Sequence, residues 1–215
     1  MHCRLTVWTS LTARFLVGFG ASLTLLIAVT AAMAEDQPAG PNTPSDREAF
    51  LAGTVRDCRG CDLREAKLKR RDLSGAQLEG AVMTQVRMQH GRLTRAVLRG
   101  AEISMSLIME AEMAGSDLSH ASLKRSNLSG ANLSRCNLTA AVLDGAGFVR
   151  ARLSGATLKD ISAKQVDFYE ADLSGSNLTD GDFRGSRLQQ ADLNGAITDG
   201  MKTKGALLVD GTIGQ

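Results

Sequence analysis

The chain has 215 residues, of which only 4% are aromatic while 22 are glycine. A core so poor in aromatic side chains has to be assembled from many small aliphatic contacts, which is unusual for an ordinary globular domain. Lys and Arg number 25 against 23 Asp and Glu. This balance excludes the strongly basic surface on which generic nucleic-acid binding depends, and equally the acidic surface of a polyanion mimic.

Residues 1–34 have the features of a secretory signal peptide. Arg4 and Arg14 supply positive charge, residues 15–30 are almost continuously apolar, and residues 32–34 (Ala-Met-Ala) have the small-x-small pattern of a cleavage site. The apolar run is shorter than the roughly 20 residues of a membrane span, so an uncleaved N-terminal membrane anchor is the alternative. Cleavage after residue 34 would remove both arginines and leave a neutral mature chain. We therefore expect a periplasmic or secreted protein.

Residues 35–45 contain all three prolines of the chain and are interpreted as a linker. The following segment, residues 45–48 (Ser-Asp-Arg-Glu), has the spacing of a capping box, in which Ser and Glu satisfy free amides at a helix N-terminus. We expect a short helix over residues 45–52, within an N-terminal cap at residues 46–55. Its apolar contact with the rest of the chain would include Phe50.

A five-residue period runs through residues 56–200. Every fifth residue from 58 to 193 belongs to one apolar column, and 26 of its 28 members are Leu, Ile, Met or Phe, where a random column would hold about six. The residue two before each of them is Ala, Ser, Gly or Cys in 23 of the 28 repeats. Asp or Asn lies between the two in 12 repeats, and Gly closes 11. No insertion breaks the register.

This period fits neither a helix, whose apolar residues are three or four apart, nor a simple strand, whose period is two. It fits a chain that runs extended for about three residues, with the small and the large side chain on one face, and then turns. Gly and Ser adopt turn conformations at low cost, which places the corner in the last two positions. Repetition winds the chain into a tube whose coils pair about 4.8 Å apart.

Three stretches carry a resemblance to a known family: residues 171–175 (Ala-Asp-Leu-Ser-Gly), 131–135 (Ala-Asn-Leu-Ser-Arg) and 191–195 (Ala-Asp-Leu-Asn-Gly). They resemble the A-(D/N)-L-x-x consensus of the pentapeptide-repeat family, and the resemblance covers all 28 repeats. It implies an all-β fold, a right-handed quadrilateral β-helix with four repeats per coil, hence about seven coils and a rod of roughly 34 Å. Residues 20 apart should then stack, including Phe148 on Phe168.

Both ends of a β-helix expose edges that need covering. Residues 201–215, where the pattern has decayed, resemble the apolar C-terminal tail that closes members of this family. We find no long amphipathic helix of the kind through which some members dimerise. Arg71 occupies an inward position in the first coil, and we interpret its charge as escaping past the open end of the tube.

Residues 58–61 (Cys-Arg-Gly-Cys) form a CxxC motif whose two cysteines both fall on inward positions. A redox role belongs beside a βαβ pattern, and a metal site needs a second pair or histidines; neither accompanies the motif. We interpret Cys58 and Cys61 as packing of the first coil, with a local disulfide in an oxidising compartment. Redox catalysis is the alternative. Cys136, in a small inward position, is interpreted as structural.

We find no catalytic, cofactor-binding or metal-binding pattern in the sequence. His90 and His120 both occupy corner positions, but their spacing is not a whole number of four-repeat coils, so they should lie on different sides. The Asp and Asn residues recur with the repeat and are interpreted as turn groups rather than as paired catalytic carboxylates. We predict a protein that is not an enzyme and has no cofactor.

Basic residues concentrate in the first half of the solenoid. Between Arg64 and Arg99 there are nine basic residues against three acids, whereas acids prevail from Lys159 to Asp199. A solvated surface with chance asymmetry is one interpretation. The other is a basic contact for anionic lipid or glycan, in which Arg87, Arg92 and Arg95 would take part.

Met105, Leu107 and Met109 place three apolar side chains on nominally outward positions within one short stretch. Clustered apolar exposure of this kind often marks a contact surface. A local irregularity that buries the three side chains is the alternative.

Three classes of function remain. We favour a non-catalytic scaffold or protein-interaction module of the cell envelope, whose partner is an unidentified protein or envelope component, with at most weak contact to an anionic membrane surface. The family resemblance also implies DNA mimicry toward type II topoisomerases, as in its quinolone-resistance members, but neutral charge and the signal peptide oppose that role. An enzyme, the third class, lacks a candidate site. No nucleic-acid partner is expected.

Overall fold

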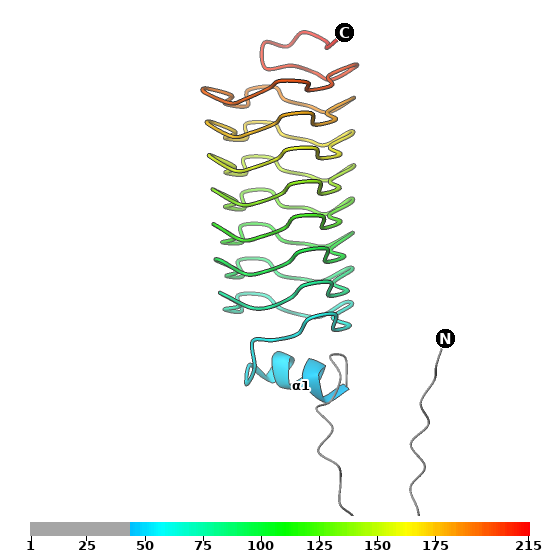
Figure 1. The fold of residues 1–215 in the computed structure, drawn as a ribbon, viewed down its shortest axis with the longest axis vertical. Coiled ribbons are helices and arrows are strands. Elements are labelled where there is room, and N and C mark those ends of the chain that lie inside the picture. Colours follow the sequence, from blue (N-terminus) through cyan, green and yellow to red (C-terminus); the bar gives the residue numbers. More distant parts are fainter. Residues whose placement is uncertain (1–43) are drawn as a thin grey trace, which may run out of the picture. The chain divides into compact units, whose positions relative to one another are not determined.

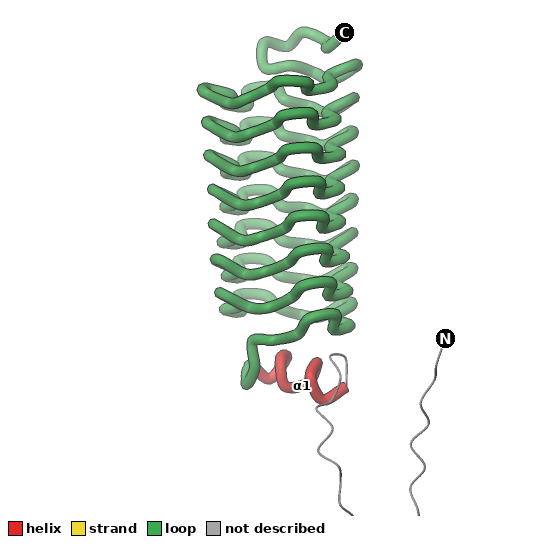
Figure 2. The backbone as a smooth tube through the Cα atoms, in the orientation of Figure 1, coloured by secondary structure: helices red, strands yellow, loops and turns green. Residues whose placement is uncertain are grey.

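The computed structural model describes residues 44–215. The predicted signal peptide and nearly all of the predicted linker lie outside the described residues. In the described part, no helix has the length and apolar character needed to cross a bilayer. One helix, α1 (Pro44–Ala52), begins a residue earlier than the predicted helix and ends where that prediction placed its end. A stack of similar coils follows it (Figures 1 and 2).

Parallel backbone pairing fixes the size of each coil. Twenty-seven bridges join residues exactly one period of 20 apart, from Asp57–Gln77 to Arg187–Leu207. A coil therefore contains four pentapeptides, one to each side. Each side contributes a single bridged residue per coil, so the coils pair as neighbouring strands of a parallel sheet do without building long strands of their own.

The five positions of a repeat, numbered with Arg56 as the first, have distinct structural roles. First positions are small and point inward, third positions are large and point inward, and second and fourth positions point outward. The fifth position forms the corner, and from Gly60 to Gly205 every one has φ between 55° and 72°. Glycine adopts this left-handed conformation freely, whereas for other residues it costs roughly 1–2 kcal/mol. Seventeen corners nevertheless hold other residues, among them Ala140 at 56°.

Third-position side chains fill the tube. From Leu63 to Leu188 each is at most 4% exposed. The predicted stacking of Phe148 on Phe168 is confirmed, since the ring centroids are 5.3 Å apart with an interplanar angle of 27°. Phe183, on a neighbouring side, adds a contact that the sequence did not indicate, with its ring 5.7 Å from that of Phe168. The interior is a set of stacked apolar ladders held by close packing.

Asp and Asn at second positions bond the one amide of the repeat that the backbone pairing does not use. In residues 81–85, backbone carbonyls accept from the first, second, third and fifth amides. The fourth amide donates instead to the side chain two residues earlier: Thr179 N–H donates to Asn177 Oδ1 at 3.0 Å, and Ser174 N–H to Asp172 Oδ1 at 3.0 Å. These contacts are Asx turns. The interpretation of this column as turn groups is confirmed.

α1 ends in a Schellman motif next to the first coil. The N–H of Thr54 donates to Ala49 O and that of Gly53 to Phe50 O, both at 3.0 Å, with Gly53 at φ 82°. Phe50 is 1% exposed and belongs to the same apolar core as the coils.

Arg71 links the first coil to this helix end. Its Nη1 donates to Leu51 O at 2.8 Å and its Nη2 to Phe50 O at 3.3 Å. The interpretation of Arg71 as a charge that escapes past an open end was therefore wrong. A cation at the carbonyl end of a helix is favoured both by the free carbonyl groups and by the helix dipole.

The coil register continues past residue 200, where the repeats were predicted to end, and reaches Leu207. Backbone pairing persists there because it does not require a large third-position side chain, and residues 198 and 203 are both Thr. Leu207 then pairs antiparallel with Ile213. Burial is weaker at this end, where the third-position Leu193 is only partly buried and Thr198 is exposed.

Candidate functional site

Of the grooves on the outside of the coils, two contain arginines that form no ion pair within residues 44–215. The first lies beside the side formed by residues 66–70, 86–90, 106–110 and the equivalent repeats of later coils, here called the Leu107 face. This groove, called the Leu107 groove, has a volume of about 490 Å³. It is lined by Glu65, Lys67, Gln85, Arg87, Met105 and Leu107.

The Leu107 groove joins two features that are separate in the sequence. Leu107 is 38% exposed and Met105 is 51% exposed. Arg87 is bridged directly to Leu107 on the adjacent coil. Neither Lys67 nor Arg87 forms an ion pair with any carboxylate in residues 44–215. Part of the basic segment and two of the apolar residues therefore share one surface, on which two cations stand beside one acid, Glu65.

The other predicted contact residues lie elsewhere or are less accessible. Met109 belongs to the Leu107 face but is half-buried. One coil before it in the same column, Gln89 has a buried Oε1 with no hydrogen-bond partner in the described part of the chain. Arg92 is on the next side, and Arg95 is at the far corner of that side. The structure thus brings Arg87, but neither of these two arginines, to the apolar residues.

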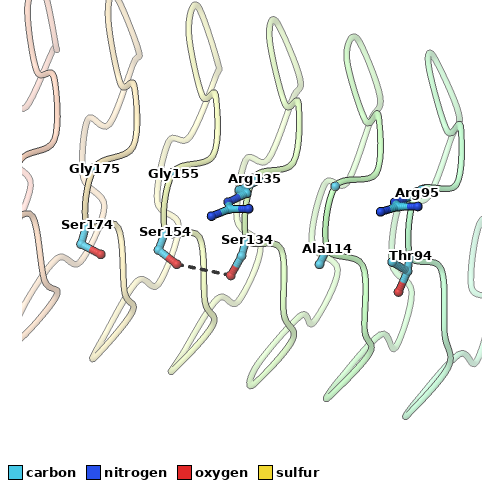
Figure 3. A pocket seen from close by; sticks show the side chains of 10 residues that line it. Thr94, Arg95, Ala114, Ser134, Arg135, Ser154, Gly155, Ser174 and Gly175 are labelled. Carbon is cyan, nitrogen blue, oxygen red and sulfur yellow. Dashed lines mark hydrogen bonds between the residues drawn. The ribbon is translucent and has the colours of Figure 1, made fainter.

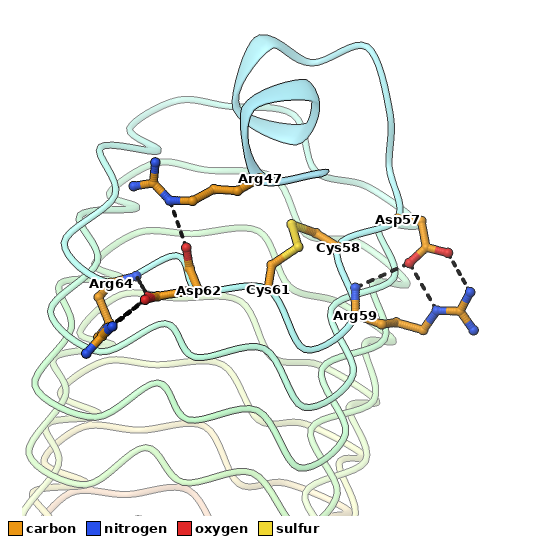
Figure 4. The surroundings of a disulfide bond; sticks show 7 residues. All are labelled: Arg47, Asp57, Cys58, Arg59, Cys61, Asp62 and Arg64. Atoms are coloured by element: carbon orange, nitrogen blue, oxygen red, sulfur yellow. Dashed lines mark hydrogen bonds and ion pairs between the residues drawn. A yellow bond between two sulfur atoms is a disulfide. The ribbon is translucent and has the colours of Figure 1, made fainter. Parts of the chain in front are cut away.

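Cys58 and Cys61 are joined by a disulfide in the first coil (Figure 4). Each is 2% exposed, so the bond packs inside the coil. On the outside, a side-chain hydrogen bond from Arg64 lowers the pKa of Asp62 to about 2. Redox exchange requires an accessible thiolate, and the buried pair offers none in this arrangement.

The remaining candidate residues are engaged in local contacts. His90 Nδ1 lies 3.1 Å from Glu110 Oε2, and His120 stands at a different corner. Cys136 is buried, which raises the pKa of its thiol, and its Sγ donates to Met113 O at 2.9 Å. Within the range that the structure describes, no three His, Cys, Asp or Glu side chains are grouped so as to hold a metal ion.

The second groove was not identified from the sequence. It follows one corner of the tube over five successive coils and has a volume of about 600 Å³ (Figure 3). Fourth- and fifth-position pairs line it, and it is called the Arg95 groove here. The pairs are residues 94–95, 114–115, 134–135, 154–155 and 174–175.

Alternation of arginine and glycine shapes the Arg95 groove. Arg95 and Arg135 are two coils apart, with Gly115 between them. A Cβ on Gly115 would lie 3.8 Å from Arg95 Cγ, and a Cβ on Gly155 would lie 3.6 Å from Arg135 Cγ. Each arginine stem therefore lies across the glycine of the next coil. The signal in the sequence is a fifth-position Arg that recurs two coils later, which has meaning only once the length of a coil is known.

Coils of four five-residue repeats, with inward ladders and left-handed corners, define a β-helical solenoid protein. The model of the family described as "Pentapeptide repeats" matches eight copies, at residues 61–100, 121–160 and 167–197, about half of the chain. The chain belongs to the pentapeptide-repeat family, and its coils are those of the family's right-handed β-helix. No curated protein matches the sequence.

Solved structures of similar proteins come from varied sources. HetL, a pentapeptide repeat protein involved in heterocyst differentiation regulation in Nostoc sp. strain PCC 7120, is 27% identical; the match covers 80% of this chain and 99% of HetL, with a TM-score of 0.27. QnrB1, a plasmid-mediated fluoroquinolone resistance protein, is 18% identical over 67% of this chain and 84% of its own, with a TM-score of 0.48. A pentapeptide repeat protein from the Arabidopsis thaliana thylakoid lumen is 25% identical over 52% and 71%, with a TM-score of 0.19.

Proposed function

We propose that the protein is a non-catalytic protein-interaction module of the cell envelope, exported by its N-terminal signal. The Leu107 groove is the observation that supports this most directly. Two exposed apolar side chains, Met105 and Leu107, lie there beside the unpaired cations of Lys67 and Arg87. Apolar anchors bordered by polar and charged groups are typical of protein contact surfaces.

The covered N-terminal end of the solenoid supports lateral binding. In this proposal the protein has about seven coils, and α1 caps the N-terminal edge, where Phe50 and Arg71 hold it. A covered edge does not recruit further strands. The long sides are then the surfaces on which a repeat protein of this kind binds its partner.

DNA mimicry toward a topoisomerase is the alternative, and charge opposes it. A mimic of duplex DNA needs a dense array of negative charge. Both grooves instead carry arginines that have no acidic partner within residues 44–215: Arg87 in the Leu107 groove, and Arg95 and Arg135 in the Arg95 groove.

Substitution in the Leu107 groove tests the contact. The double variant Met105→Asp, Leu107→Asp should lose the cross-linked complexes that the natural chain forms in envelope extracts. Ile197→Asp is the matched control, because Ile197 is also an exposed second-position residue, on another side. Retention of every complex by the double variant would refute the contact surface. Recovery of the uncleaved product in the cytoplasm would refute export.

A further inference from the structure

The Arg95 groove contains two cations, Arg95 and Arg135, whose charge is not neutralised within the described part of the chain. Neither Arg95 nor Arg135 forms an ion pair with a carboxylate of residues 44–215. Nearby acids are engaged elsewhere: Glu112 accepts from Asn132 Nδ2 at 2.8 Å, and Asp117 pairs with Arg99 at 3.3 Å. Both guanidinium groups are therefore available to an acidic ligand.

The spacing of the two arginines is set by the coils. Neighbouring coils pair about 4.8 Å apart, so backbone positions two coils apart are separated by about 9.6 Å along the groove. Both residues have φ of 57°, so they leave the backbone in the same conformation. A linear ligand that meets both arginines needs one acidic group about every 9.6 Å on a single side.

A row of hydroxyl groups accompanies the arginines. Thr94, Ser134, Ser154 and Ser174 occupy fourth positions along the groove, and Ala114 interrupts the row between Thr94 and Ser134 (Figure 3). Ser134 Oγ and Ser154 Oγ are 3.3 Å apart and bond each other. Hydroxyl groups donate as well as accept, so this row can bond the backbone of a ligand that runs parallel to the axis of the coils.

We propose that the Arg95 groove binds an acidic peptide segment in the polyproline II conformation, with a carboxylate at every third residue. Three residues of such a helix rise about 9.3 Å and complete one turn, so every third side chain faces the same way. This repeat matches the separation of Arg95 and Arg135. The polyproline II backbone makes no internal hydrogen bonds, so its carbonyl groups can accept from the serine and threonine hydroxyls.

Other peptide conformations fit the groove less well. In a β-strand, residues on one face are two apart, about 6.6 Å, and the third residue points the opposite way. An α-helix is about 10 Å wide and satisfies its own backbone groups, so it would neither enter a shallow corner groove nor use the hydroxyl row. The polyproline II peptide alone combines the right repeat with free carbonyl groups.

Peptide titrations test the proposal on the full chain. The probe is a fluorescent peptide of four Glu-Pro-Pro units, compared with four Gln-Pro-Pro units and with a peptide of four Glu-Pro-Pro-Pro units. The first should bind best, because the second lacks charge and the third places its carboxylates about 12 Å apart and on different sides. Arg95→Gln or Arg135→Gln should each weaken binding about threefold, as expected for an exposed ion pair.

Arg125→Gln is the matched control for these variants. Arg125 is also a corner arginine, with φ of 55°, and its Cγ lies 3.5 Å from the Cβ position of Gly145. It repeats the local arginine-over-glycine packing at another corner, outside the Arg95 groove. Its substitution should leave peptide binding unchanged. An equal loss with Arg125→Gln would overturn the assignment to the Arg95 groove.

Gly175 provides a gain-of-function test. It lies two coils beyond Arg135, and nothing stands within 4 Å of a Cβ built on it. Gly175→Arg should extend the ladder and strengthen binding of a longer peptide of six Glu-Pro-Pro units about threefold. Gly195→Arg adds the same charge three coils beyond Arg135, out of phase with the two-coil repeat, at a corner where a Cβ meets no atom closer than 4.0 Å, and should give a smaller gain. Equal gains in affinity from the two substitutions would overturn the spacing argument. In a separate titration, tighter binding of linear polygalacturonate than of the peptides would overturn the choice of a peptide as the ligand. Neither result would affect the Leu107 groove.

Discussion

Arg71 Nη1 donates to the carbonyl oxygen of Leu51 at 2.8 Å and so ties the first coil of the solenoid to the last turn of α1. Residue 71 is a first position, which in most repeats is small and points inward. The departure from the repeat pattern is explained by the helix end, where Phe50 O also accepts from Gly53 N–H but Leu51 O has Arg71 as its donor.

Arg71→Met should lower the free energy of unfolding by about 1–2 kcal/mol, because the carbonyl group of Leu51, at a partly buried helix end, loses its donor. Urea unfolding followed by circular dichroism measures the change. Arg70→Met is the control, since Arg70 is an exposed corner residue that forms no ion pair within residues 44–215. Equal effects of the two substitutions would show that the link to α1 contributes nothing.

Ala140→Gly should stabilise the protein by about 0.5–1 kcal/mol. Ala140 has φ of 56°, and release of that strain exceeds the extra backbone entropy that glycine loses on folding. Ala141→Gly should have the opposite sign, because Ala141 is fully buried in the inward ladder. Thermal melts of the two variants distinguish the corner from the core, and destabilisation by both would contradict corner strain.

Asn177→Ala should cost about 1–2 kcal/mol, since the amide of Thr179 loses its acceptor. The hydroxyl of Thr179 also donates to Asn177 Oδ1, at 2.6 Å. Asn177→Asp retains an acceptor in the same place and should unfold close to the natural protein at neutral pH. If alanine and aspartate proved equivalent in urea titrations, the Asx turn would have no part in stability.

Asp182 should make stability depend on acid pH. A side-chain hydrogen bond from Arg184 lowers the pKa of Asp182 to about 2 from its ordinary value of 3.8. Because the folded state holds the charged carboxylate more strongly, its contribution is fully present above pH 4 and is lost as pH falls toward 2. Asp182→Asn should therefore reduce the decline in urea midpoint between pH 4 and pH 2, and an unchanged decline would contradict the assignment.

The sequence predicted what depends on the repeat and on the length of a coil, but not what depends on the width of the tube or on the position of α1. The alternation of small and large residues indicated the inward columns, and the four-repeat coil implied by the family resemblance placed Phe148 on Phe168. The contact between Phe168 and Phe183 could not be predicted, because the two residues lie on neighbouring sides and meet only if the interior of the tube is narrow enough. The role of Arg71 needed the position of α1. Arg87 and Leu107 are also 20 residues apart, so the four-repeat coil places them side by side as well, and the structure was needed for the groove that they share with Met105.

The four-repeat register limits how the length of this chain can change during evolution. An insertion of one repeat would preserve the inward columns and fold as another side of a coil, yet it would rotate every later residue to the next side of the tube. Arg95 and Arg135 would then no longer line one corner if the insertion fell between them. Gene duplications that keep the outer surfaces intact must therefore add whole coils, whereas the interior tolerates any whole number of repeats.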